Sequence, residues 1–346
     1  MLAEFRLGRQ SFQFKNPPVI RSWASVAGKK EAEGPLGSSF DVVSRDAYWG
    51  QKTFEQAEQA MQQTALRRML RKADLKQEDL NVVFSGDLLN QCIGSSFCLR
   101  NSGIPHIGLY GACSTMAESL LLAAMAVGGG FADRAAAMTS SHFCSSERQY
   151  RFPLGYGGQR TPTSQWTVTG AGAALVTENG PGPRITGCTV GCITDLGIKD
   201  MSNMGAAMAP AALSTIKQHF KDFSSGPEDD DLIVTGDLGQ LGKDLLMEIA
   251  HREGLDLGGK LTDCGTLIFD NTVQSVNAGG SGCGCSAAVL CGDLLNRLMS
   301  GTLQKILFCG TGALLSPLSS QQGLTIPAIC HGVILEGPGA SSPEPK

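Results

Sequence analysis

Two helical stretches of this chain are apolar on every side, and this feature constrains the fold more than any other. Residues 117–127 are almost wholly Ala, Leu and Met, and residues 286–299 are nearly as apolar. A helix that is apolar all round cannot face water. Because the two stretches occupy equivalent places in two similar halves, we expect a layered sandwich, with helices between two sheets and further helices outside.

The rest of the chain alternates expected strands and helices in a similar order in each half. In the first half we expect strands at 19–27, 80–85, 107–111, 135–140 and 167–177 and a helix at 53–72. In the second half we expect strands at 184–192, 232–235 and 305–310, helices at 208–223 and 242–253, and a strand or a connection at 266–269. The alternation favours largely parallel pairing. We divide the chain into halves at 1–180 and 181–336, followed by a disordered Pro-, Ser- and Gly-rich tail at 337–346.

Composition excludes several classes of protein. With 346 residues, 42% hydrophobic and 17% charged, the chain can bury a large core, and its net charge of -4 does not suit nucleic acid. The 12 cysteines show no disulfide spacing and mostly lie in apolar runs, which indicates a reducing compartment. Cys283 and Cys285 have no second cysteine pair nearby, so we expect no metal site and no cofactor. No signal peptide or membrane span is expected, and the chain reads as soluble.

One corner of the chain is a candidate nucleophile elbow. An apolar strand end runs into Gly111 and Ala112, which are small enough to allow a sharp, strained turn before Cys113. The spacing of Thr115 and Glu118 predicts a capping box at the start of the following helix. A thiol at a helix N-terminus feels the positive end of the helix dipole, which favours the thiolate and attracts anions.

Three segments together resemble the thiolase-like superfamily. Gly111–Ser114 matches its elbow, Gly279–Cys283 its glycine-rich segment before the second buried helix, and Gly310–Ala313 a glycine corner near the end of the fold. The resemblance implies an α/β fold, a duplicated five-layer α-β-α-β-α sandwich, with a nucleophilic cysteine at the first buried helix.

A closer resemblance is to the stage V sporulation protein AD family (SpoVAD), over about residues 17–336. The segments that carry it are 85–91 (SGDLLNQ), 110–118 (YGACSTMAE), 139–143 (TSSHF) and 147–153 (ERQYRFP). It implies a protein that binds pyridine-2,6-dicarboxylic acid (dipicolinic acid), free or as its calcium salt, and assists its uptake into the developing spore. It also implies other SpoVA membrane proteins as partners, and a peripheral place at the forespore or spore inner membrane through them.

The chain departs from the pattern of the condensing enzymes in this superfamily. Those enzymes need a histidine and a second histidine or asparagine, both from the second half, to polarise the thioester and move protons. The matching corners here are 235–239 and 280–282, and neither contains such a residue. We therefore expect a non-catalytic binding protein. One alternative is a thiolase-like acyltransferase or condensing enzyme that uses Cys113 with a remodelled acid/base set, and another is a scaffold subunit with no ligand.

The five histidines of the chain are weighed one by one. His219 and His251 lie in amphipathic helical patterns, so we expect both to be exposed. His331 lies in a late strand, roughly where thiolases carry a catalytic histidine or cysteine. His142 follows the strand at 135–140, at a carboxyl end where α/β sites gather. His106, in a loop before a strand, indicates nothing.

Dipicolinate is flat, aromatic and doubly anionic, so its site should offer N–H or cationic donors and apolar walls. The expected ligand-binding residues are Asp87, Cys113, His142, Arg148 and Arg151. For Asp87 the alternative is a helix cap, and for each arginine it is a solvated loop. We also expect a homodimer whose partner-facing strand is 135–140.

Overall fold

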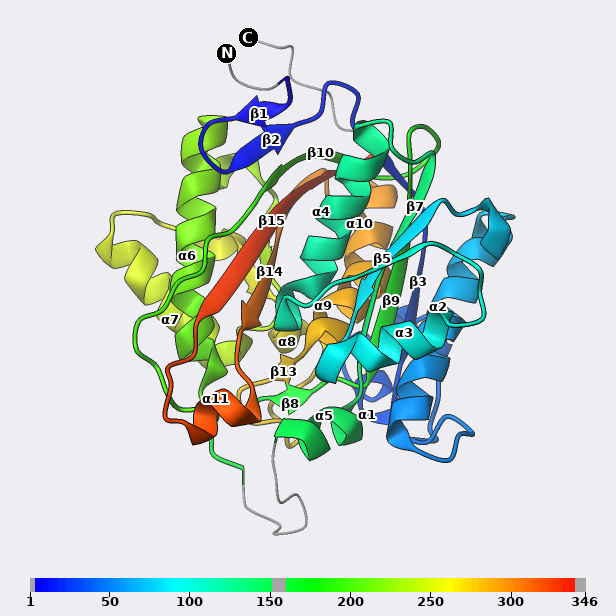
Figure 1. Ribbon diagram of the computed structural model, residues 1–346. Helices are drawn as coiled ribbons and strands as arrows, with labels where there is room; N and C mark the ends of the chain where they lie inside the picture. The colour runs from blue at the N-terminus through cyan, green and yellow to red at the C-terminus, as the bar shows by residue number, and fades with distance from the viewer. Residues whose placement is uncertain (1–3, 151–159, 340–346) are drawn as a thin grey trace.

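The computed structural model describes residues 4–150 and 160–339, which form two sheets with helices between and outside them (Figure 1). The first sheet has the order β6-β5-β7-β9-β3, and the second has the order β12-β11-β14-β15-β10. One residue pair, Val19 of β3 with Arg184 of β10, joins them at one end. The strands of the first sheet are β3 (Val19–Ala27), β5 (Val82–Gly86), β6 (His106–Gly108), β7 (Arg134–Ser141) and β9 (Gly170–Thr177). Those of the second are β10 (Arg184–Thr189), β11 (Leu232–Thr235), β12 (Leu261–Asp263), β14 (Lys305–Ala313) and β15 (Ala328–Glu336).

The two sheets repeat one topology. In chain order, each sheet places its third, second, fourth, fifth and first strands side by side, with two parallel and two antiparallel pairs. The prediction of largely parallel pairing is therefore wrong. β14 and β15 are neighbours joined through the short helix α11 (Pro317–Gln321), and antiparallel neighbours need no crossover helix.

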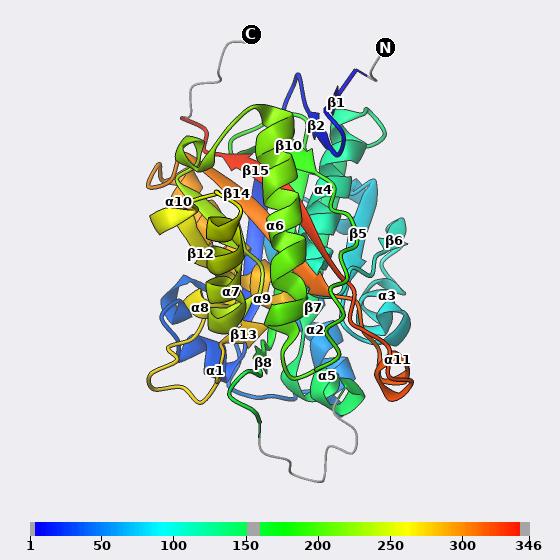
Figure 2. The ribbon, with the colours of Figure 1, turned by 90° about the vertical axis from the view of Figure 1, so that its left-hand side faces the viewer.

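The buried helices are confirmed. Helix α4 (Thr115–Gly128) packs against β5 and β7 of one sheet and against β14 and β15 of the other. Beside it run α9 (Cys283–Val289), a π-helical turn (Leu290–Leu294) and α10 (Leu295–Met299). Helices α2 (Phe54–Lys72) and α3 (Ile93–Leu99) cover the outer face of the first sheet, and α6 (Met204–Phe223) and α7 (Gly239–Arg252) that of the second (Figures 1 and 2).

Shorter elements complete the described structure. Of residues 266–269, expected as a strand or connection, the first two end the short helix α8 (Cys264–Leu267), which is capped by the side chain of Asp263, and the last two follow it as a bend. The other short elements are β1 (Arg6–Leu7), β2 (Ser11–Gln13), α1 (Lys29–Ala32), β4 (Val42–Val43), α5 (Phe143–Tyr150), β8 (Trp166–Thr167), α8 (Cys264–Leu267) and β13 (Gly280–Ser281).

The expected exposure of His219 is wrong. It is 1% exposed, and its Nδ1 lies 3.0 Å from the hydroxyl of Thr189 in β10. The N-terminal hairpin pairs with β10 and is fixed to the end of α6, because the backbone N–H of Gln10 and the hydroxyl of Ser11 donate to Asp222. His251, by contrast, is exposed as expected. A hairpin docked from far away in the sequence could not be inferred from the helical pattern alone.

The strand expected to face a second copy of the chain lies inside the sheet. β7 pairs with β5 on one side and with β9 on the other along its length, so it has no free edge. The edge of the first sheet at this side is β6. The prediction that strand 135–140 faces a second copy of the chain is therefore wrong.

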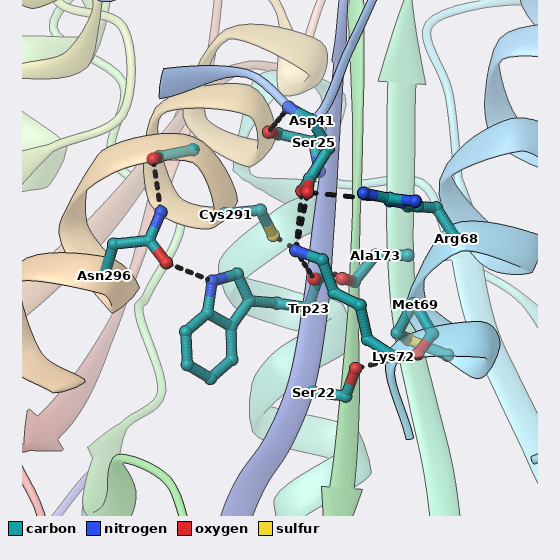
Figure 3. A network of polar contacts seen from close by, with 11 residues as sticks. Ser22, Trp23, Ser25, Asp41, Arg68, Met69, Lys72, Ala173, Cys291 and Asn296 are labelled. Carbon is teal, nitrogen blue, oxygen red and sulfur yellow. Dashed lines mark hydrogen bonds and ion pairs between the residues drawn. The ribbon is translucent and has the colours of Figure 1, made fainter. Parts of the chain in front are cut away.

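Side chains close the middle of β3 at its other edge (Figure 3). There β3 pairs with β10 only at Val19 and with β4 only at its last two residues. In between, the ammonium of Lys72 donates to the carbonyl of Trp23, and the N–H of Ser25 donates to the Asp41 carboxylate. Lys72 and Asp41 also form an ion pair of 2.7 Å. These contacts satisfy backbone groups that would otherwise invite another strand.

Candidate functional site

The elbow is strained as expected. Ala112 has a φ of +50°, unusual for a residue with a side chain, and Cys113 follows it in a single 3₁₀ turn (Ala112–Ser114) that leads into α4. The predicted capping box is absent. Instead, Thr115 lies inside the first turn, where its hydroxyl donates to the carbonyl of Ala112 and accepts from the N–H of Gly111. The threonine thus holds the turn before the helix.

Glycines of β14 let the second half approach the elbow closely. A Cβ atom on Gly312 would lie 2.3 Å from the carbonyl oxygen of Gly111, and one on Gly310 would lie 2.5 Å from Cβ of Ala117. The segment Gly310–Ala313, singled out in the sequence, therefore packs directly on the Cys113 turn. Any larger side chain at these positions would displace it.

The partner of Cys113 in this site is a carboxyl group. Asp237, in the 235–239 corner after β11, lies close enough to the Cys113 thiol for its charge to act on the sulfur. The Oδ2 atom of Asp237 accepts from the N–H of Gly282 at 2.8 Å, and its Oδ1 atom accepts from the Thr311 hydroxyl at 2.9 Å. The corners at 235–239 and 280–282, which the sequence resemblance matched to the catalytic corners of condensing enzymes, thus meet beside Cys113 and bring an acid and a backbone N–H there.

This environment disfavours the thiolate. Cys113 is 6% exposed, and burial together with the neighbouring carboxylate of Asp237 raises its pKa well above the usual value. Burial also raises the pKa of Asp237, although the nearby Cys113 thiol and the hydrogen bonds from Gly282 and Thr311 act in the opposite direction. The local field of Asp237 therefore opposes the effect of the α4 dipole that the sequence suggested.

Four further residues surround the thiol. Leu88 and Cys283 are buried against Cys113, and Tyr150 packs on the same group. The Tyr150 hydroxyl donates to the carbonyl of Leu88 at 2.9 Å and lies 2.6 Å from the hydroxyl of Tyr110, which is 43% exposed. We call Leu88, Tyr110, Cys113, Tyr150, Asp237 and Cys283 the Cys113 site.

Asp87 contacts this site through its neighbour. Its side chain is fully buried, and its carboxylate accepts from the N–H of Leu89 and from both the N–H and the hydroxyl of Ser95. This is the cap-like arrangement that the sequence left open as an alternative. It fixes the loop that carries Leu88 onto Cys113, and ligand contact by Asp87 stays a prediction.

Of the other predicted ligand residues, His142 directly precedes α5 and Arg148 lies on it. His142 is buried, with Nε2 2.8 Å from the carbonyl of Ala47 and Nδ1 accepting from the N–H of Cys144. Arg148 forms an ion pair with Glu55 of α2 and is half-exposed. Arg151 lies outside the described residues. The structure joins Cys113 with none of these by a hydrogen bond or ion pair among the described residues, so their ligand roles stay predictions.

Sequence reasoning missed Asp237, Tyr110, Tyr150 and Cys283. The signal for Asp237 was present, because it stands in the corner where the condensing enzymes carry a histidine. His331, placed near the thiolase catalytic corner, is buried and accepts from the N–H of Gly191. In the described part of the chain, no group of three or more His, Cys, Asp or Glu side chains is arranged to hold a metal ion.

Comparison with solved structures identifies the fold. The chain is similar to the crystal structure of 3-oxoacyl-[acyl-carrier-protein] synthase III from Aquifex aeolicus, with a TM-score of 0.55 and 13% identity over 92% of this chain and 99% of that one. It is also similar to OleA of Xanthomonas campestris, with a TM-score of 0.58 and 14% identity over 94% and 97% of the two chains. These likenesses confirm a thiolase-like α/β fold and carry no more than that.

Sequence comparison identifies the family. Residues 8–336 match the family described as Stage V sporulation protein AD (SpoVAD). Stage V sporulation protein AD of Bacillus subtilis (strain 168) is 44% identical over 335 residues, which cover 97% of this chain and 99% of that protein. No helix within residues 4–150 and 160–339 is long and apolar enough to cross a membrane. The chain belongs to the stage V sporulation protein AD family.

Proposed function

We propose that this protein binds dipicolinate without transforming it, and assists its uptake into the developing spore. The observation that carries the proposal is the buried carboxyl group of Asp237 beside the Cys113 thiol, held by the N–H of Gly282 and the hydroxyl of Thr311. A condensing enzyme acylates its cysteine through the thiolate, with cationic or neutral donors around the carbonyl. Here a buried carboxyl group lies on the sulfur and disfavours the thiolate, so attack on a thioester is slow.

The same residues suit a small aromatic ligand. The N-terminus of α4 lies at the elbow, where the positive end of its dipole favours a carboxylate, although the N–H of Thr115 already donates to the carbonyl of Ala112. Leu88 offers an apolar wall for a ring, and the hydroxyls of Tyr110 and Tyr150 offer neutral polar groups at the exposed side of the site. In this proposal Asp87 is a positioning residue, because it holds the loop that presents Leu88.

We further propose that the protein acts as a homodimer at the forespore or spore inner membrane, held there by other SpoVA membrane proteins. The free edge for pairing two copies is β6, where Ile107 is 48% exposed. Light scattering at micromolar concentration tests this part. A dimeric mass that Ile107→Lys reduces to a monomeric mass supports it, and a monomeric mass of the wild type contradicts it.

Titration calorimetry with dipicolinate tests the binding proposal. We expect saturable heat for the wild type and for Cys192→Ala, a control at an exposed thiol, and weakened binding for Cys113→Ala. Benzene-1,3-dicarboxylate, which lacks the ring nitrogen, tests selectivity. Intact-mass analysis after incubation with an acyl thioester covers the alternative function. No heat at millimolar dipicolinate, together with an acyl group on Cys113, would replace this proposal with an acyltransferase.

A further inference from the structure

Asp237 is a buried acid with only neutral donors around it. It is fully buried, its carboxyl oxygens accept from the N–H of Gly282 and the hydroxyl of Thr311, and the Cys113 thiol lies beside it. Within the described residues, no Lys, Arg or His forms an ion pair or a hydrogen bond with it. No positive charge is therefore present beside the buried carboxylate to compensate the negative charge of a second anion.

The other titratable groups that face Asp237 are neutral or acidic. The thiol of Cys113 comes from the 3₁₀ turn before α4, those of Cys283 and Cys285 from α9, and that of Cys264 from α8. From the end of β12 comes Asp263, which is also fully buried and accepts from the N–H groups of Leu238 and Gly239. Each of these groups is neutral when protonated and negatively charged when ionised. The field at the elbow is therefore set by acids, although the ligand proposed for it is a dianion.

We infer that binding of an aromatic dicarboxylate at the Cys113 site takes up one proton, which Asp237 shares with the nearer carboxylate of the ligand. The inference rests on the proposed function and deepens it. Two carboxylates in contact in a buried site cannot both stay ionised, so one proton from solvent joins the pair. The protonated member then donates an O–H to the other, and no covalent bond changes.

The shared proton makes the affinity for the ligand depend on the ionisation of Asp237. The free ligand is a dianion near and above neutral pH, whereas free Asp237 is ionised only above its own pKa, which burial raises. Below that pKa the proton is already in place, and binding needs no uptake. Above it, the affinity falls as pH rises, by up to about tenfold per pH unit for one proton.

Calorimetry with dipicolinate from about pH 6 to about pH 9, in phosphate and in Tris, tests this inference. The ionisation enthalpies of the two buffers differ, so proton uptake makes the observed enthalpy depend on the buffer. We expect the wild type to show uptake approaching one proton and weaker binding at the high end of the range. Asp237→Asn should bind with neither dependence, and Glu31→Gln, a buried acid replaced elsewhere, should behave as the wild type.

The outcomes separate the two levels of the proposal. Saturable heat with the same enthalpy in both buffers and an affinity that does not change with pH overturns the proton coupling and leaves the binding function standing. No saturable heat for the wild type at any pH overturns both. The wild-type measurement decides between these outcomes even if Asp237→Asn does not fold, which a thermal melt would reveal.

Discussion

Replacing Asp237 by asparagine should make Cys113 more reactive, and the size of the effect follows from the contact between them. A carboxylate and a thiolate about 4 Å apart interact by about 4 kcal/mol at an effective dielectric constant of about 20. Removing that repulsion lowers the pKa of the Cys113 thiol by about 3 and raises the thiolate fraction about 1000-fold. A less basic thiolate is a weaker nucleophile, so the intrinsic alkylation rate of the thiolate falls about 20-fold at a Brønsted coefficient of about 0.45. The net gain in alkylation rate is about 50-fold.

The assay is iodoacetamide labelling of the folded protein at mildly alkaline pH, with the modified cysteine located by peptide mass spectrometry. Glu31→Gln is the matched control, because it also replaces a buried carboxyl group by an amide but does not contribute to the field at Cys113. Its labelling rate at Cys113 should equal that of the wild type. A rate in Asp237→Asn within about threefold of the wild-type rate would refute the view that Asp237 keeps the thiol protonated.

Three further predictions concern stability. Asp41→Ala removes the acceptor of the Ser25 N–H at the edge of β3 and should lower the free energy of unfolding, measured in urea, by about 1–3 kcal/mol. The control Glu248→Ala, at an exposed ion pair, should change it by under about 1 kcal/mol, and equal losses for the two variants would contradict the prediction. Gly312→Ala should lower the free energy of unfolding by about 1–3 kcal/mol, because the new Cβ meets the carbonyl oxygen of Gly111. The control Gly259→Ala, whose Cβ would have no atom within 4 Å, should leave it unchanged in the same urea titration. Burial lowers the pKa of His219 from 6.5 to about 4, so as the pH falls this side chain takes up a proton in the unfolded chain before it does so in the folded protein. The free energy of unfolding should therefore fall by up to about 3 kcal/mol between pH 6.5 and 4. His219→Gln should show a smaller fall, and a fall equal to that of the wild type would contradict the assignment.

The layering of the fold could be predicted because burial leaves a direct mark on sequence. A helix such as α4 that offers no polar side to water has only one kind of place in an α/β protein, between two sheets. Strand positions followed from short apolar runs, and β3 and β11 have the expected bounds. Strand direction did not follow, because a short connection such as α11 and a crossover helix are hard to tell apart in a pattern of apolar residues.

The candidate site could be predicted in part. The elbow at Cys113 was found because a sharp turn needs small residues, and the two corners that meet it were found through the family resemblance. The contact with Asp237 was not found, because a lone carboxylate after a strand looks the same whether it faces a thiol or water. His219 shows the same limit, since it is buried against Thr189 of β10, a strand distant in sequence. Contacts between distant segments decide both cases.

The most direct test of the binding function is a crystal structure of the protein with dipicolinate. We expect the ligand ring against Leu88, one carboxylate within hydrogen-bond distance of Asp237, and an unmodified Cys113. Ligand bound elsewhere on the molecule, or no ligand in crystals grown at millimolar dipicolinate, would contradict the proposed site.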